Sequence, residues 1–100
     1  MRQLSIGREA QADLLAAVRW YVAQNPELGR AFRSAVRAAL ASASEQPLRY
    51  RCAHREVRVI RLRRFPYRVF FVAEPDRLLV VAVLHVRRPP SVWQQRPIDQ

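Results

Sequence analysis

Apolar positions in the first half of the chain recur with the period of a helix. The first stripe lies between Glu9 and Gln24 and comprises Ala10, Leu14, Val18 and Tyr21. This spacing predicts an amphipathic helix. The helix should end at Asn25, because the residue before a proline disfavours helical dihedrals, and Asn25-Pro26 should cap and open a second helix. The second stripe ends before Pro47 and comprises Leu28, Phe32, Ala35, Val36, Ala39, Leu40 and Ala43. We therefore expect an antiparallel pair of helices.

The second half has the features of β-strands. Residues 57–64, 67–73 and 78–85 are rich in β-branched and aromatic side chains, which favour strands. Residues 74–77 have the length and composition of a hairpin turn, and residues 3–6 predict one more short strand. The element order is therefore β-α-α-β-β-β. This order predicts an α+β fold, in which an antiparallel αα-hairpin packs on a small, largely antiparallel β-sheet.

The predicted sheet is apolar on both faces. Residues 69–72 and 78–84 are apolar at odd and even positions alike, whereas a sheet covered on one side should alternate. A pair of helices covers only one face. The second face is covered by the C-terminal tail, folded back with Trp93 as a plug, by a partner protein, or by both. The alternation along 57–64 also breaks at Val59-Ile60, which a β-bulge would explain.

The length of the chain predicts one domain, over residues 1–100, and the proline-rich residues 89–100 predict an extended C-terminal arm. The longest apolar run has seven residues, against about 20 for a transmembrane helix, and no signal peptide is recognised. Cys52 is the only cysteine, which excludes an internal disulfide and fits a reducing compartment. We expect a soluble, cytoplasmic protein with no membrane partner.

Positive charge is concentrated in the middle of the chain. The formal net charge is +10, and all 18 basic residues are arginine. Residues 49–68 hold eight of them against one acidic residue, Glu56, with Tyr50 and Tyr67 interleaved. Such a strip repels itself unless an anionic partner binds it, and guanidinium–aromatic pairs are typical of nucleic-acid surfaces. Acidic residues of a partner protein would serve equally well. A plain nucleic-acid-binding module is therefore one candidate function.

Few groups in the sequence offer chemistry. Cys52 and His54 lack the further ligands that a metal site needs, and two glycines do not make a phosphate-binding loop. We expect no metal and no cofactor. The best catalytic set is His85 as general acid or base, with Arg64 and Arg87 on a scissile phosphate. A structural role for His85, with its ring hydrogen-bonded to a backbone carbonyl, is the alternative.

The order of these segments resembles the RelE/ParE toxin superfamily of type II toxin–antitoxin systems. The resemblance covers roughly residues 4–96 and begins with EAQADLLAAVRWY and NPELGRAF. It continues with RRFPYRVFFVAEPDRLLVVAVLHVRRPPSVWQQR, which looks like the ParE pattern of basic strand, FPY corner, hydrophobic hairpin, histidine, arginine pair, tryptophan and arginine. The resemblance implies the same α+β fold.

It also implies a cognate acidic antitoxin, ParD-like or similar, whose C-terminal segment wraps the toxin. The free toxin would then be prone to self-association. We expect the antitoxin to contact Trp20, Tyr21, Phe32, Arg58, Tyr67, Arg68, Phe70 and Val72.

Two activities occur in the superfamily: ParE-like members poison DNA gyrase, and RelE-like members cut mRNA on the ribosome. RelE-like nucleases combine arginine, lysine, glutamate, histidine and a late tyrosine, whereas this chain has no lysine and no tyrosine after Tyr67. The resemblance therefore favours a non-enzymatic gyrase poison, with ribosome-dependent mRNA cleavage as the alternative. The residues expected to contact the target are Arg61, Arg63, Arg87, Arg88, Trp93 and Arg96.

Overall fold

The computed structural model describes residues 2–97. Its elements run in the order β1 (Gln3–Ile6), α1 (Arg8–Gln24), α2 (Pro26–Glu45), the 3-10 turn η1 (Pro47–Arg49), β2 (Cys52–His54), β3 (Val57–Arg61), β4 (Tyr67–Ala73), β5 (Arg77–His85) and α3 (Ser91–Gln94). The predicted α+β order is confirmed. The Asn25 side chain accepts a hydrogen bond from the Glu27 amide and Pro26 opens α2, as the sequence indicates.

The strands form one five-stranded sheet in the order β1-β5-β4-β3-β2. All neighbours are antiparallel except β1 and β5, which are parallel. The sequence did not predict β2, which has only three residues. β3 ends at Arg61 rather than at residue 64, because the chain turns there: the Leu62 amide donates to the Tyr67 carbonyl and the Tyr67 amide to the Phe65 carbonyl.

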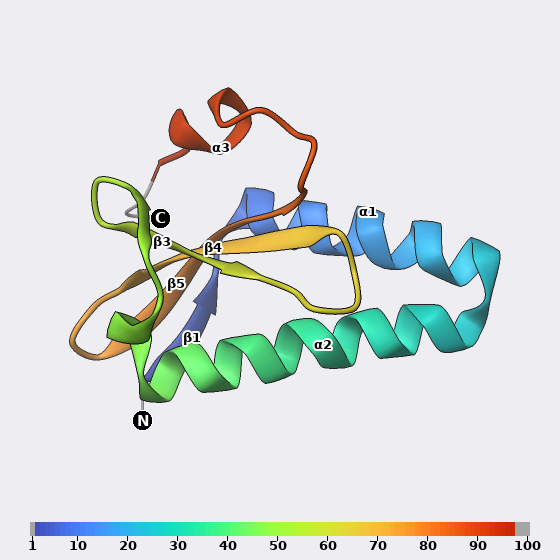
Figure 1. Cartoon of the computed structure of the whole chain (residues 1–100), viewed down its shortest axis with the longest axis horizontal. Helices are drawn as coiled ribbons and strands as arrows, with labels where there is room; N and C mark the ends of the chain where they lie inside the picture. The colour runs from blue at the N-terminus through green and yellow to red at the C-terminus, as the bar shows by residue number, and fades with distance from the viewer. Residues whose placement is uncertain (1, 98–100) are drawn as a thin grey trace.

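The two long helices lie side by side against one face of the sheet (Figure 1). The FPY corner, Phe65-Pro66-Tyr67, packs between the helices and the sheet. The Phe65 ring centroid lies 5.0 Å from that of Tyr21 and 5.2 Å from that of Phe32, and Tyr67 lies 5.0 Å from Phe32. Such edge-to-face contacts add about 0.5–1.5 kcal/mol each beyond their burial. The corner therefore anchors the β3–β4 loop to the helix pair.

Gly29 sets the distance between α1 and α2. A Cβ at this position would lie 2.3 Å from Cγ2 of Val22. We expect Gly29→Ala to lower the free energy of unfolding by about 1–3 kcal/mol in urea titrations, through overpacking. In a Val22→Ala background the same change should be stabilising, because alanine is the better helix former by about 1 kcal/mol. Equal effects in the two backgrounds would contradict this account of the contact.

The C-terminal segment covers the second face of the sheet. Trp93 of α3 is 5% exposed and stacks on Phe70 with a centroid distance of 4.5 Å. In Figure 1 the segment after β5 returns to the sheet on the side away from α2. The tail is thus the plug that the sequence offered as one alternative. Residues 89–100 are not simply extended, since Ser91–Gln94 form a short helix whose burial of Trp93 favours ordered structure; residues 98–100 of the predicted arm lie outside the described residues.

The sheet contains a bulge, but not where the alternation suggested it. β3 pairs with β4 without interruption from Arg58 to Arg61. The prediction of a bulge at Val59-Ile60 is therefore wrong: both residues are buried because Val59 faces the tail and Ile60 faces the helices. The register shifts instead at Val81 of β5, since Phe70 pairs with Ala82 and Phe71 with Val80.

A largely buried ion pair holds the tail at this bulge. Nη1 of Arg96 lies 2.6 Å from Oδ2 of Asp13 and Nη2 lies 3.1 Å from Oδ1, a two-pronged contact. Arg96 also donates to the Val81 carbonyl, and Asp13 accepts from the Val83 amide at 3.0 Å. One carboxylate on α1 therefore fastens the bulge and the C-terminal segment together.

Within residues 2–97, none of the helices has the length and apolar character that crossing a membrane requires.

Candidate functional site

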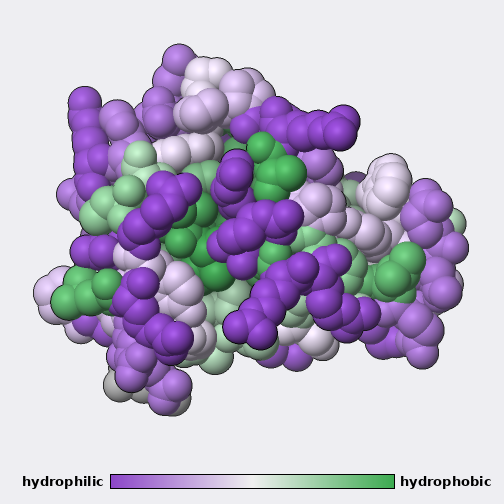
Figure 2. All heavy atoms as spheres, in the orientation of Figure 1, coloured by the Kyte–Doolittle hydropathy of each residue, from purple (hydrophilic) through white to green (hydrophobic). Residues whose placement is uncertain are grey.

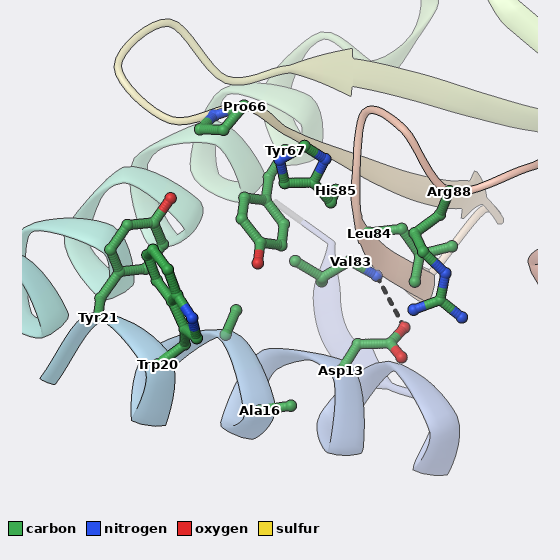
Figure 3. Close-up of a pocket in the computed structure, with 11 residues that line it drawn as sticks. Asp13, Ala16, Trp20, Tyr21, Pro66, Tyr67, Val83, Leu84, His85 and Arg88 are labelled. Atoms are coloured by element: carbon green, nitrogen blue, oxygen red, sulfur yellow. Dashed lines mark hydrogen bonds between the residues drawn. The ribbon is translucent and has the colours of Figure 1, made fainter. Parts of the chain in front are cut away.

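A pocket of about 410 Å³ lies between α1 and the ends of β4 and β5. Figure 3 shows Asp13, Ala16 and Trp20 on α1, facing Tyr67, Val83 and His85 from the strands, with Arg88 at one end. The small side chains of Ala16 and Ala17 leave the space open, and Trp20 is 59% exposed beside it. The pocket therefore offers an aromatic wall and one guanidinium to a partner.

His85 lies in this pocket, but its ring is not set up as a general base. The Arg87 amide donates to Nδ1 of His85 at 3.1 Å, and the His85 ring packs edge-on against Tyr67 at 5.4 Å. Because Nδ1 accepts a hydrogen bond, the neutral ring carries its proton on Nε2, which can only donate. The geometry therefore favours a structural role for His85, although its backbone partner is the Arg87 amide and not the expected carbonyl.

The other members of the predicted catalytic set lie elsewhere. The Arg64 guanidinium lies over the Phe65 ring, 5.6 Å from its centroid, and does not line the His85 pocket. Arg87 lines a separate pocket on the second face of the sheet. The structure does not bring His85, Arg64 and Arg87 together in one cavity. Nor do residues 2–97 place three or more metal-ligating side chains in a cluster.

Burial raises the pKa of two tyrosines beside the pocket. The effect on Tyr21 is increased by Tyr67, and that on Tyr67 is partly offset by Arg88. A raised pKa favours the neutral phenol in the folded state, so this contribution to stability is complete below about pH 10 and is lost above it. We expect urea titrations to show the free energy of unfolding falling above about pH 10, with a shallower fall for Tyr21→Phe. A variant curve as steep as the wild type would contradict this assignment.

The residues expected to contact the target fall into two groups. Arg63, Arg87 and Arg88 are exposed, as a contact surface requires. Arg61 is exposed but donates to the Leu62 and Phe65 carbonyls and so braces its own loop. Trp93 and Arg96 are engaged inside the molecule, because the tail packs back on the sheet. Their predicted role as target contacts would require the tail to leave.

The residues expected to contact the antitoxin also fall into an exposed group and a buried group. Trp20 is open to solvent, and Arg58, Tyr67 and Arg68 are partly exposed. Arg58 and Arg68 each donate to a backbone carbonyl, of Tyr50 and Val86 respectively. The remaining four residues are buried in the two hydrophobic clusters of the core. They are Tyr21, Phe32, Phe70 and Val72. Phe32, on α2, is fully buried in the core between the helices and the sheet.

Sequence reasoning missed two residues. The sequence patterns single out neither Asp13 nor Arg51, which is one of eight arginines between residues 49 and 68. Asp13 fastens the tail, and Arg51 lines the second-face pocket with Arg87. No local pattern signals either contact, since Asp13 and Arg96 are 83 positions apart.

Comparisons with known proteins agree with the fold and name the family. The chain covers 96% of a chain from the chromosomal ParDE toxin–antitoxin system of P. aeruginosa, over 85% of its own length, with a TM-score of 0.72 and 20% sequence identity. No curated protein matches the sequence. The family model described as "ParE toxin of type II toxin-antitoxin system, parDE" matches residues 4–90. The chain therefore belongs to the family of ParE toxins of type II toxin–antitoxin systems.

Proposed function

We propose that this toxin poisons DNA gyrase and has no nuclease activity of its own. Family membership supports the gyrase target, and one structural observation carries the non-enzymatic part. His85 lines the pocket beside α1, and its Nδ1 accepts a hydrogen bond from the Arg87 backbone amide. Its two predicted arginine partners lie outside that pocket. Because the His85 acceptor nitrogen is occupied and neither predicted arginine lies in the pocket, RNA cleavage lacks a general base and the expected charge stabilisation of the phosphate.

One observation favours the alternative, ribosome-dependent mRNA cleavage. His85, Tyr67 and Arg88 do line the same cavity. The ribosome would have to supply or reorient whatever base the reaction needs.

A gyrase supercoiling assay with purified toxin, gyrase, ATP and relaxed plasmid distinguishes the two functions. We expect loss of supercoiling and accumulation of linear, protein-linked DNA. His85→Ala should poison gyrase as well as the wild type, because the ring takes no part in the proposed mechanism. An unaffected plasmid, together with transcripts cut only when ribosomes are present and only by the wild-type protein, would replace gyrase poisoning by the nuclease.

The proposal includes a cognate acidic antitoxin, as in the ParDE system that the fold resembles. The open pocket with Trp20, Tyr67 and Arg88 supports such a contact, since it offers an aromatic wall and one positive charge to an acidic amphipathic segment. The tail already covers the second face, so self-association of the free toxin rests on other apolar side chains. The exposed ones are Leu4, Ile6, Leu15, Trp20, Val22 and Leu48.

A further inference from the structure

Four arginines surround a second pocket, on the face of the sheet away from the helices. The cavity measures about 440 Å³. The sheet contributes Phe70 and Ala53 to its lining, and the C-terminal segment contributes Pro89, Pro90 and Trp93 as a wall. We call this cavity the arginine pocket, after Arg51, Arg68, Arg87 and Arg88.

The topology explains why these four charges meet. Arg51 and Ala53 flank Cys52 and so share one face of the edge strand, while Arg68 and Phe70 alternate on β4 in the same way. Arg87 and Arg88 follow β5, where the chain turns to cross that face. The four charges come from three segments that are separated in sequence and meet only in the folded chain. Charges that are merely solvated need not converge in this way.

The positive charge of the arginine pocket is not neutralised within the described part of the chain. The ion pairs of Arg30, Arg77 and Arg96 lie elsewhere, and among residues 2–97 no carboxylate forms an ion pair with any of the four pocket arginines. Arg68 donates to the Val86 carbonyl at 3.2 Å, which orients its guanidinium without balancing its charge. Four permanent charges in one cavity repel one another, so an anion that enters gains attraction from all four.

The surroundings favour a polymer of regularly spaced anions. More arginines, Arg61, Arg63 and Arg64, lie on and beyond the end of β3, directly before the turn into β4 and Arg68. In Figure 2 hydrophilic side chains cross the middle of the view, where Figure 1 draws β3 and β4, with hydrophobic side chains between them. A nucleic-acid strand carries one charge per nucleotide along a continuous backbone, whereas acidic side chains of a peptide are separate and flexible. An arginine guanidinium can donate two hydrogen bonds to the oxygens of one phosphate, a bidentate contact.

We propose that the arginine pocket binds the phosphodiester backbone of a nucleic acid and holds it without cutting it. Its lining contains no histidine, carboxylate, lysine or tyrosine to move a proton. This inference rests on the proposed function and deepens it, because a gyrase poison works where duplex DNA is already held. DNA is therefore the expected source of the phosphodiester, and the toxin touches the DNA as well as the enzyme.

The test is fluorescence anisotropy of the full-length toxin with a short labelled DNA duplex, without gyrase. We expect binding at about 50 mM salt that weakens steeply towards about 200 mM, with a log–log slope near −3 for three to four phosphates. Arg51→Gln/Arg87→Gln should weaken binding about 10-fold or more and make the slope shallower by about 2. The matched control is Arg33→Gln/Arg37→Gln, which removes the same charge from exposed positions of α2. Both variants must melt at the wild-type temperature.

Each further outcome decides for or against the pocket. Equal losses in the two double variants would overturn it, because net charge alone would then explain the binding. Poly-L-glutamate and unlabelled DNA are compared as competitors at equal total charge. If poly-L-glutamate displaces the labelled duplex as effectively as the DNA does, the pocket binds acidic peptides and the proposal is overturned too. An RNA duplex of the same sequence tests the source: the tighter-binding duplex identifies it, and cleavage of either probe would overturn binding without chemistry. Gyrase poisoning is measured separately, so binding without poisoning contradicts only the proposed function.

Discussion

Replacing Trp93 with alanine is expected to lower the free energy of unfolding by about 3–5 kcal/mol, the usual cost of removing a buried tryptophan. Trp93 covers the second hydrophobic cluster of the sheet and stacks on Phe70 at 4.5 Å. Its loss uncovers apolar strand residues such as Leu84 and Val81. The measurement is urea unfolding followed by circular dichroism. The variant should also expose hydrophobic surface and bind a dye such as ANS.

The chain supplies its own control, because it has only two tryptophans. Trp20 is 59% exposed, so Trp20→Ala should change the free energy of unfolding by about 0.5 kcal/mol or less. The Trp20→Phe variant leaves Trp93 as the single tryptophan, and its fluorescence should be blue-shifted and resist quenching by acrylamide. Similar losses for the two alanine variants, or a readily quenched Trp93, would show that the tail does not cover the sheet.

Breaking the Asp13–Arg96 pair should have the second largest effect. Asp13 and Arg96 have side chains only 13% and 12% exposed, and removing one partner leaves the other charge desolvated and unpaired. Asp13→Ala also deprives the Val83 amide at the bulge of its acceptor. We expect a loss of about 3 kcal/mol in urea unfolding. Amide exchange at Val83 should become faster than at neighbouring strand positions.

An exposed ion pair is the matched control for this change. Glu27 and Arg30 have side chains 73% exposed, and removing such a pair costs about 0–1 kcal/mol. Glu27→Ala should therefore be nearly neutral by comparison. In the double-mutant cycle of Asp13→Ala and Arg96→Ala, the second change should cost much less once the first is made. Additive losses would mean that the two side chains act independently and that the tail is held by Trp93 alone.

The sequence predicts the elements well because their signals are local. The stripe at Leu14, Val18 and Tyr21, the Asn25-Pro26 step and the apolar hairpin each act over a few residues. The structure confirms the helices and the three main strands, with the FPY corner packed against them. The short strand β2 was missed because three residues carry no periodicity, and it exists only through pairing with β3.

The site was less predictable because burial and long-range contacts decide it. Phe32 and Val72 were expected at a partner surface, yet an apolar side chain in a pattern does not say which apolar neighbour it meets. Arg96 was expected to contact the target, but Asp13 holds it inside. Alternation at Val59 and Ile60 suggested a bulge, whereas burial of both sheet faces explains it. Only the placement of one segment against another resolves such alternatives.

The meeting of the two chain ends also orders events during synthesis. The first strand, β1, pairs with the last one, β5. Asp13 cannot form its ion pair until Arg96, 83 residues later, has been synthesised. At about 5–20 residues per second, that wait is on the order of ten seconds. By the later part of that interval the helix pair, which ends at Glu45, has been synthesised, while the tail-covered face and the arginine pocket do not yet exist. A partner that binds the helices can therefore capture the nascent chain before it matures. A chain released early, lacking the last few residues, would never complete that surface.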